Sequence, residues 1–214
     1  AAVKLKAEKA YNAAAELFDA APLAFWNRHG RRTIERMGLR RGAYVLDVCC
    51  GTGASALPAA QAVGPEGKVI AVDLAGELLK LGQAKAQAAG LQSLEFHRGD
   101  MTSLGFPDHH FDAVLCVFGI FFVPDMETQV AELWRMVRPG GRLAITTWGK
   151  RFWSPAYELW LEVVRRRRPD LHTAFNPWDR ITTTDAVCRL LRNGGAQNVE
   201  VDAVDDCQTL RAPE

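Results

Sequence analysis

Strand-like apolar runs alternate with helical patterns through the middle of the chain, and this alternation constrains the fold more than any other feature of the sequence. The runs predict five buried strands with three helices between them. The strands are expected over 43–49, 68–74, 94–100, 111–119 and 142–148, and the helices from about Ser55, over 76–89 and over 126–137. This order predicts an α/β fold in which a mostly parallel sheet is covered by helices on both faces.

The flanking segments are less regular, and with 214 residues the whole chain has the size of one domain. A helical segment is expected over 4–38, and an insert rich in aromatic residues follows the fifth strand. A helix near 183–193 and a strand near 198–209 are expected towards the end. Within the insert, Arg165–Arg168 close an amphipathic helix, and we interpret this basic run as a solvated helix end.

Charge and cysteine content argue against several classes of function. Lys and Arg total 26 against 25 for Asp and Glu, so neither a nucleic acid nor an anionic membrane is expected as the main partner. No apolar run approaches the roughly 20 residues of a membrane-spanning helix, and the first residues lack the apolar core of a signal peptide. The 5 scattered cysteines form no CxxC pair, which predicts a reducing, cytoplasmic location. We expect no metal, because the adjacent Cys49 and Cys50 would point to opposite faces of a strand.

A glycine loop after the first predicted strand, in the stretch VLDVCCGTGAS (45–55), indicates a ligand site. Gly51, Gly53 and Ala56 loosely match the dinucleotide pattern G-x-G-x-x-G/A, and Asp73 ends the second strand. Glycine lets a nucleoside approach the backbone closely, and a carboxylate at a strand end can accept hydrogen bonds from two ribose hydroxyls. From these residues alone, NAD and other adenosine ligands fit equally well.

Four segments together resemble the successive motifs of class I S-adenosylmethionine-dependent methyltransferases, in order and in spacing. They are VLDVCCGTG, VIAVDLAGELL, EFHRGDMTSLGFPDHHFDAVLCVFGIFFVPD and RMVRPGGRLAITTW, and the resemblance covers roughly residues 11–205. The most similar subset is the small-molecule group that includes the ubiquinone and menaquinone C-methyltransferases. The resemblance implies a Rossmann-like, doubly wound sheet of seven strands, one of them antiparallel. It also implies S-adenosylmethionine as the cofactor and S-adenosylhomocysteine as its product.

The same resemblance implies a role for residues at the carboxyl ends of the predicted strands. Asp47, Gly51, Thr52 and Gly53 would lie beside the methionine part of the cofactor. Asp73 would bind the ribose hydroxyls, Leu74 would pack against the adenine, and Asp100 would accept a hydrogen bond from the adenine amino group, with Met101 beside it. Near the sulfonium the resemblance places Cys116, Val117 and Phe118. This ligand carries no phosphate, and Asp47 would add a carboxylate near its ammonium group. Structural roles are the alternative, since Asp47 and Asp100 could instead cap local backbone amides.

Aromatic residues are expected to form the acceptor pocket, because methyl transfer from a sulfonium neutralises charge and favours a poorly hydrated site. The candidates are Phe25, Trp26, Phe121, Phe122, Trp148 and Trp153.

If the acceptor needs a base, His29 and His172 are the candidates, and a surface or capping role is the alternative for each. In contrast, His109 and His110 occupy the turn entering the fourth strand and are expected to take no part in catalysis. The sequence leaves the acceptor and the oligomeric state open.

Two other classes of function remain as alternatives. The fingerprint of an NAD-dependent oxidoreductase places its first glycine directly after the strand, whereas Asp47–Cys50 intervene here, and Tyr157 lacks a lysine four positions later. A non-catalytic binding module on the same fold would be expected to lose the ligand carboxylates, yet Asp73 and Asp100 are present. After the fourth strand, CVFGIFF replaces the Asn/Asp-Pro-Pro-aromatic tetrad of many nucleic-acid and protein N-methyltransferases, which favours a small-molecule acceptor.

The expected organisation is a single methyltransferase domain over 1–214. Its parts are a helical N-terminal lid (1–40), a cofactor-binding core (41–148), a substrate-side insert (149–182) and a last helix and strand (183–214), after which a further strand is missing or cut short.

Overall fold

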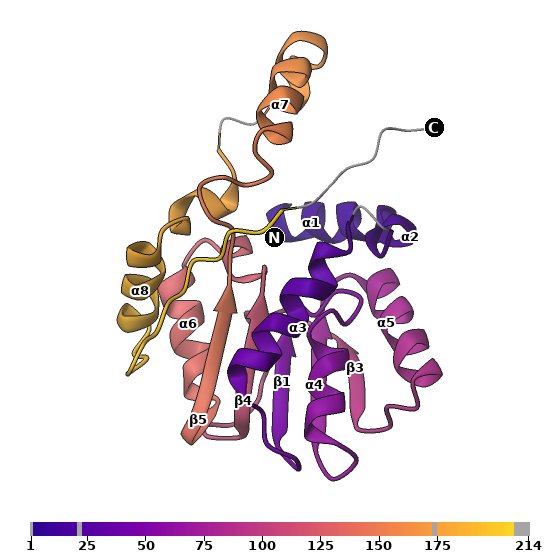
Figure 1. The fold of residues 1–214 in the computed structure, drawn as a ribbon, viewed down its shortest axis with the longest axis vertical. Helices are drawn as coiled ribbons and strands as arrows, with labels where there is room; N and C mark the ends of the chain where they lie inside the picture. The colour runs from indigo at the N-terminus through magenta and orange to yellow at the C-terminus, as the bar shows by residue number, and fades with distance from the viewer. Residues whose placement is uncertain (1, 21–22, 173–174, 208–214) are drawn as a thin grey trace.

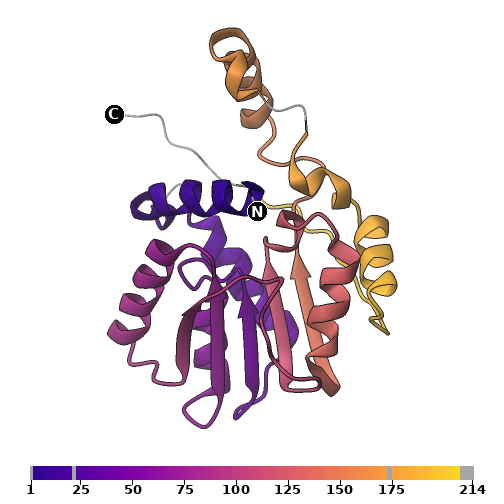
Figure 2. The same ribbon diagram turned by 180° about the vertical axis from the view of Figure 1, so that it is seen from behind.

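The computed structural model describes residues 2–20, 23–172 and 175–207, and its centre is a parallel sheet (Figures 1 and 2). The strands are β1 (Tyr44–Val48), β2 (Lys68–Asp73), β3 (Leu94–Arg98), β4 (Phe111–Val117) and β5 (Val137–Thr146). They lie in the order β3-β2-β1-β4-β5, and every neighbouring pair is parallel. The α/β, doubly wound architecture predicted from the alternation is confirmed.

Helices cover both faces of the sheet because successive strand residues point to opposite sides. One face packs against α3 (Phe25–Met37), α4 (Ala56–Val63) and α5 (Gly76–Ala88), and the other against α6 (Met126–Arg135) and α8 (Thr184–Asn193). Val45 and Val69 belong to the core of the first face, whereas Leu46 and Ile70 belong to the core of the second. The strands are therefore buried on both sides, as expected for a parallel sheet.

The N-terminal segment forms α1 (Ala2–Ala13) and α2 (Ala15–Phe18) ahead of α3, and α1 lies across the carboxyl ends of the strands (Figures 1 and 2). Helix α3 approaches the glycine loop very closely at Gly30, where an added Cβ would lie 2.2 Å from the carbonyl oxygen of Ala54. Glycine is required at this position because any side chain would collide with the backbone of the loop.

Two expectations for the end of the chain are wrong. The described residues contain five strands, all parallel, rather than seven with one antiparallel. The strand expected over 198–209 is not formed over 198–207, and 208–209 lie outside the described residues. Two acidic residues of this segment instead pair with α3, where Arg28 Nε lies 2.7 Å from Asp206 Oδ2 and Arg36 pairs with Asp202. The segment 198–207 therefore runs beside α3 without pairing with a strand.

The boundary between α6 and β5 also differs from the expectation. The helix ends at Arg135 instead of residue 137, and β5 begins at Val137 instead of residue 142. Val137 pairs with Phe111, but the register then shifts, so that Ala113 pairs with Arg142. The intervening Pro-Gly-Gly forms an irregular start of the strand, as expected where a bulge interrupts the ladder.

The insert after β5 contains α7 (Ala156–Arg167) and two 3-10 turns, Pro169–Leu171 and Pro177–Ile181. Helix α7 projects away from the sheet, and its last turn carries Arg165, Arg166 and Arg167, all exposed (Figures 1 and 2). The expected amphipathic helix with a basic, solvated end is therefore present. None of the described helices has the length and apolar character needed to cross a membrane.

Candidate active site

A cavity of about 110 Å³ lies at the carboxyl ends of β1, β2 and β4, with residues of α1 in its wall. Of the residues expected from the sequence, those in its wall are Trp26, Gly51, Asp73, Leu74, Asp100, Met101, Val117, Phe118 and Phe122. Those outside its wall are Phe25, His29, Asp47, Thr52, Gly53, Cys116, Phe121, Trp148, Trp153 and His172. The cavity occupies the position at which ligands bind in open α/β sheets.

Asp73 joins the glycine loop to the end of β2. Its Oδ2 accepts a hydrogen bond from the Gly51 amide at 2.9 Å, and its Oδ1 accepts one from the Ala75 amide at 2.8 Å. Burial raises the pKa of this carboxyl, and the hydrogen bonds from the amides of Ala75 and Gly51 oppose that shift. Because each carboxylate oxygen has two lone pairs, both can still accept a hydrogen bond from a ligand.

The amides of the two glycines of this loop are bonded within the protein. Gly51 donates to Asp73, and the Gly53 amide donates to the carbonyl oxygen of Cys50 at 2.9 Å. A loop that binds a pyrophosphate needs such amides to point at the ligand. The arrangement therefore favours a ligand that meets the loop through carbon and hydroxyl groups and not through phosphate.

Asp47 lies directly beneath this loop and is fully buried. Its Oδ2 accepts a hydrogen bond from the Ser55 hydroxyl at 2.7 Å, whereas its Oδ1 has no hydrogen-bond partner among the described residues. Burial raises the pKa of Asp47 to about 7, and the Ser55 hydrogen bond opposes the shift. A buried carboxyl with one free oxygen is suited to a nearby cation and repels an anion.

Asp100 faces the cavity after β3 and is held on both oxygens. Its Oδ2 accepts from Lys4 Nζ at 2.7 Å, and its Oδ1 accepts from the amide and the hydroxyl of Thr102, each at 2.9 Å. Partial burial raises the pKa of Asp100, but the hydrogen bonds from Lys4 and Thr102 outweigh it and hold the pKa below its usual value. Lys4 thus occupies a lone pair of Asp100 Oδ2 at the edge of the cavity.

The ends of β1 and β4 have unusual backbone conformations where they meet the cavity. Cys49 has a φ of 61° and Phe118 a φ of 56°, in the left-handed region that residues with a Cβ seldom adopt. Gly119 fits between them, since an added Cβ there would lie 2.5 Å from the Cβ of Cys49. Strained backbone of this kind is concentrated at functional sites, where it aims side chains at a ligand.

Aromatic rings pack together in the cavity wall at the end of β4 and directly behind it. The ring centroids of Phe118 and Trp148 are 4.0 Å apart, and those of Trp26 and Phe118 are 5.3 Å apart. Phe25 packs behind Trp26, in edge contact with Trp148 and Trp153. Of the six aromatic residues expected in the acceptor pocket, Trp26 and Phe122 reach the cavity, and the remaining four support them or neighbouring parts of the fold.

Neither histidine suggested as a base lies in the cavity wall. His29 contacts the ring of Phe118, and its Nε2 lies 3.2 Å from Asp206 Oδ2. Burial lowers the pKa of His29, and Asp206 partly opposes this shift. His172 follows the turn Pro169–Leu171 in the insert.

A helical lid was expected over 1–40, but none of the α1 residues that line the cavity was named from the sequence. The cavity wall includes Lys4, Ala7, Glu8 and Tyr11 of this helix, and Phe18 of α2. Burial raises the pKa of Tyr11 to about 12, with a further contribution from Asp73. The spacing of positions 4, 7, 8 and 11 places them on one face of a helix, and this periodicity is the signal that could have revealed them.

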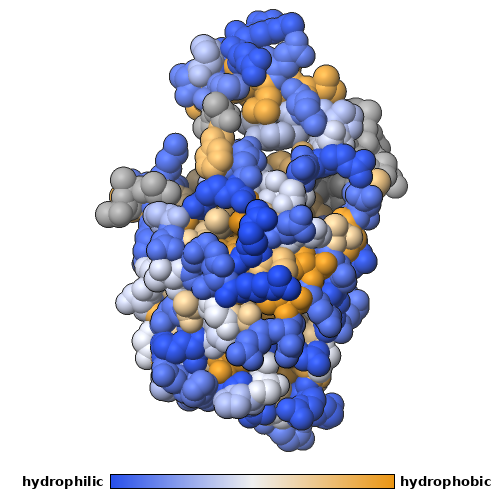
Figure 3. All heavy atoms as spheres, turned by 90° about the vertical axis from the view of Figure 1, so that its left-hand side faces the viewer, coloured by the Kyte–Doolittle hydropathy of each residue, from blue (hydrophilic) through white to orange (hydrophobic). Residues whose placement is uncertain are grey.

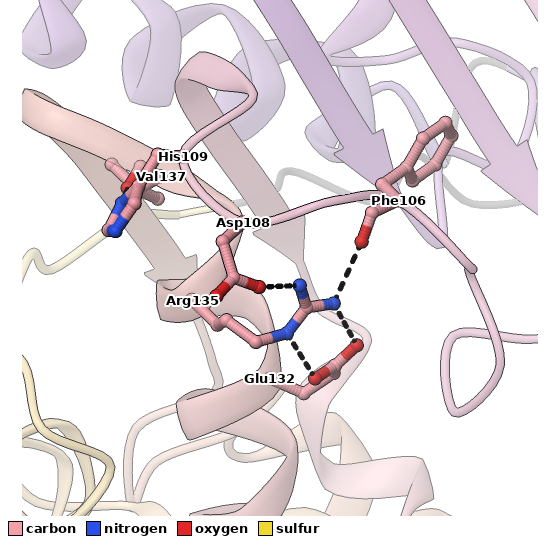
Figure 4. A network of polar contacts seen from close by, with 6 residues as sticks. All are labelled: Phe106, Asp108, His109, Glu132, Arg135 and Val137. Carbon is pink, nitrogen blue, oxygen red and sulfur yellow. Dashed lines mark hydrogen bonds and ion pairs between the residues drawn. The ribbon is translucent and has the colours of Figure 1, made fainter.

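His109 and His110 lie at the opposite edge of the sheet, where β4 begins. His109 Nδ1 is 3.1 Å from the carbonyl oxygen of Val137, next to the network in which Arg135 binds Asp108, Glu132 and the carbonyl oxygen of Phe106 (Figure 4). This network ties the turn to α6 and lies away from the cavity.

Replacement of both histidines by Asn is therefore expected to leave cofactor affinity within about twofold of wild type, because neither side chain lies in the cavity wall. Asn is chosen because it tolerates the positive φ of His109, which is 53°. The affinity for S-adenosylhomocysteine, measured by calorimetric titration, checks this expectation. A loss of affinity in a variant that unfolds at the wild-type temperature would place the ligand site elsewhere.

Comparison with known proteins agrees with this geometry. The model of the ubiE/COQ5 methyltransferase family matches residues 6–167. A demethylmenaquinone methyltransferase of Geobacillus stearothermophilus is 43% identical over 108 residues, which is 50% of this chain and 46% of the relative. The chain spans about half the length of the curated relatives that it matches.

Solved structures share the fold. A SAM dependent methyltransferase from Aquifex aeolicus superposes with a TM-score of 0.65 at 22% identity, covering 86% of this chain and 87% of that one. The [4+2]-cyclase SpnF gives a TM-score of 0.60 at 25% identity, covering 79% of this chain and 56% of that one. The resemblance to S-adenosylmethionine-dependent methyltransferases is thereby confirmed. Because the family model covers most of its length, the chain belongs to the ubiE/COQ5 methyltransferase family.

Proposed function

We propose that this chain transfers a methyl group from S-adenosylmethionine to a small-molecule acceptor by in-line displacement. The observation that carries the proposal is one cavity lined by both carboxylates and aromatic rings, next to a glycine loop in which the amides of Gly51 and Gly53 are already bonded. Asp73 and Asp100 come from the ends of β2 and β3, and Phe118 comes from the end of β4. A nucleoside joined to a sulfonium matches this distribution of polar and apolar groups.

The residues present fit that cofactor. Asp73 has lone pairs free for ribose hydroxyls, and Asp100 can accept a hydrogen bond from the adenine amino group if Lys4 yields it. Leu74 and Met101 line the cavity where they can flank the base. Gly51 would border the methionine part, and Asp47, when ionised, would supply negative potential near the ammonium group through its free oxygen. An NAD-dependent reaction is less suited, because the amides of Gly51 and Gly53 are not free for a pyrophosphate.

When bound, the cofactor supplies a methyl carbon that its sulfonium already activates towards displacement. The protein then has to hold the acceptor in line with that carbon and exclude water. Trp26, Phe118 and Phe122 line the cavity and can stack on a planar acceptor. Helices α1 and α2 would act as the lid, because Tyr11 and Phe18 close the cavity on the side facing away from the sheet.

An aromatic acceptor of the quinol type is the acceptor class that we propose. The demethylmenaquinone methyltransferases matched by this chain carry such an acceptor in their name, and the aromatic wall favours a planar ring. The cytoplasmic location and the absence of a nucleic-acid partner remain predictions. The likeness to a cyclase shows that this fold also serves other reactions, so product analysis is needed.

Methyl transfer is tested by incubating the protein with S-adenosylmethionine and a panel of naphthoquinols, benzoquinols and catechols. The expected result is S-adenosylhomocysteine together with an acceptor that has gained the mass of one CH₂, and at a cofactor concentration below saturation both form about ten- to a hundredfold more slowly with the Asp73→Ala variant. A protein that binds the cofactor but methylates none of these acceptors would contradict the proposed acceptor class. A protein that does not bind the cofactor would contradict methyl transfer itself.

Replacement of Lys4 by Met is expected to tighten the binding of S-adenosylhomocysteine by up to about fivefold. The reason is that Lys4 competes for Asp100 Oδ2, and a partly exposed ion pair of this kind contributes up to ~1 kcal/mol. Titration of Lys4→Met at low and high salt measures the effect, which should fade as salt weakens the pair in wild type. Lys6→Met is the matched control, because Lys6 is exposed and lies outside the cavity wall. Weaker binding in Lys4→Met alone would show that Lys4 assists the cofactor instead.

A further inference from the structure

Helix α7 carries an apolar face that the rest of the described structure leaves open. The helix projects beyond the sheet and packs against the turn Pro169–Leu171 (Figures 1 and 2). Leu159, Trp160 and Val163 are 62%, 54% and 58% exposed. In the space-filling view, apolar atoms lie among polar ones in this projecting part (Figure 3). Three large apolar side chains exposed together on one helix are unusual for a surface without a binding role.

Basic residues continue the same face. At about 100° of rotation per residue, Leu159, Trp160, Val163 and Arg167 fall within about a third of a turn, and Arg166 borders them. Arg167 makes no ion pair with any described residue, whereas Arg166 pairs with Glu162 one turn earlier. The arginines lie in the last turn, where they also complement the helix dipole. The exposed face is therefore apolar along its length and cationic at its carboxyl end.

Trp160 is held in an exposed orientation by its neighbours. Its ring stacks on Tyr157 with centroids 5.9 Å apart, and the Tyr157 hydroxyl donates to Asn176 Oδ1 at 3.0 Å. The indole is thus fixed before any partner binds, so little side-chain entropy is lost on docking. Leu171, in the turn after the helix, adds a further exposed apolar side chain next to the arginines.

We propose that this face of α7, formed by Leu159, Trp160, Val163, Arg166 and Arg167, docks on the surface of an anionic phospholipid bilayer. Charge complementarity selects this occupant, because the apolar side chains can enter the headgroup boundary while the arginines meet lipid phosphates and anionic headgroups. Tryptophan is suited to the boundary between lipid and water. The near-neutral charge of the whole chain makes the attraction local to α7. The proposal does not depend on methyl transfer.

Co-sedimentation with extruded vesicles tests the docking. Wild type is expected to bind an equimolar mixture of phosphatidylcholine and phosphatidylglycerol at least tenfold more tightly than phosphatidylcholine alone, and to dissociate at high salt. The Leu159→Glu/Trp160→Glu variant should bind the anionic vesicles at least tenfold more weakly. The Arg166→Glu/Arg167→Glu variant should lose at least fivefold, since each basic residue near such a surface contributes about fivefold.

Control variants carry changes of the same kind elsewhere on the surface, one apolar residue replaced by Glu and one pair of arginines reversed. Leu17→Glu alters an equally exposed leucine of α2, and Arg189→Glu/Arg192→Glu reverses two exposed arginines of α8. Both should bind anionic vesicles within twofold of wild type, and all variants should unfold at the wild-type temperature. Equal binding of wild type to neutral vesicles, no binding at all, or equal loss in the controls would overturn the proposal. A dimer that the Leu159→Glu/Trp160→Glu variant abolishes, without vesicle binding, would assign the face to a second copy of the chain.

Discussion

Replacement of Asp73 by Ala is expected to weaken the binding of S-adenosylhomocysteine about ten- to a hundredfold. Charge-assisted hydrogen bonds contribute roughly 1.5–3 kcal/mol, and 1.4 kcal/mol corresponds to a factor of ten in affinity. The loss has two causes, namely the missing acceptor for the ribose hydroxyls and the release of the loop at Gly51. Calorimetric titration of the variant beside wild type measures the change.

The same substitution should also lower the free energy of unfolding without ligand, by about 1–3 kcal/mol. The amides of Gly51 and Ala75 both lose their acceptor, and an unsatisfied buried amide costs that much. Asn should not rescue either property, because its NH₂ group would face one of these two donors. Asp185→Ala, an exposed change on α8, is the control and should bind as wild type. Unchanged affinity in Asp73→Ala would place the ribose site elsewhere.

The buried carboxyl of Asp47 is expected to make stability fall as the pH rises from about 4 to about 7. An unfolded Asp titrates near a pKa of about 3.9, whereas burial raises the pKa of Asp47 to about 7 in the folded protein. Between these values the unfolded chain has lost the proton and the folded chain still holds it, so rising pH favours unfolding. At about 1.4 kcal/mol per pKa unit, the contribution reaches roughly 4 kcal/mol and is constant above the window.

Urea unfolding of wild type and Asp47→Asn across this pH range isolates the effect. The free energy of unfolding of Asp47→Asn, relative to that of wild type, should increase by up to about 4 kcal/mol between pH 4 and pH 8, because Asn does not titrate. Ser55→Ala removes the hydrogen bond that opposes the shift and should extend the window to higher pH. A difference between Asp47→Asn and wild type that does not depend on pH would show that Asp47 is ionised in the folded protein throughout.

Much of the cofactor side of the site was predictable because strand order fixes where strand ends meet. Asp73, Asp100 and Phe118 each follow a separate strand in the sequence, and the parallel sheet brings all three to one edge. Sequence periodicity identifies the strands and the edge at which they end, whereas the choice of Asp100 and Phe118 rested on the resemblance to the methyltransferase motifs. No information about side-chain packing was needed for this part.

Within the expected N-terminal lid, the α1 residues that line the cavity were not identified, because periodicity shows which face of a helix is apolar but not which partner it meets. The same limit explains the segment 198–207, whose alternating pattern suits a strand but is used along α3. The positive φ of Cys49 could not be anticipated either, nor could the close approach of Gly119 to its side chain. These features depend on tertiary contacts that a single sequence does not encode in local patterns.

Calorimetric titration of the wild-type protein with S-adenosylhomocysteine and, separately, with NAD⁺ tests the central claim most directly. The engaged amides of Gly51 and Gly53, the carboxylates of Asp73 and Asp100, and the membership of a methyltransferase family predict one site for S-adenosylhomocysteine and no heat of binding for NAD⁺. Binding of NAD⁺ without binding of S-adenosylhomocysteine would contradict the account.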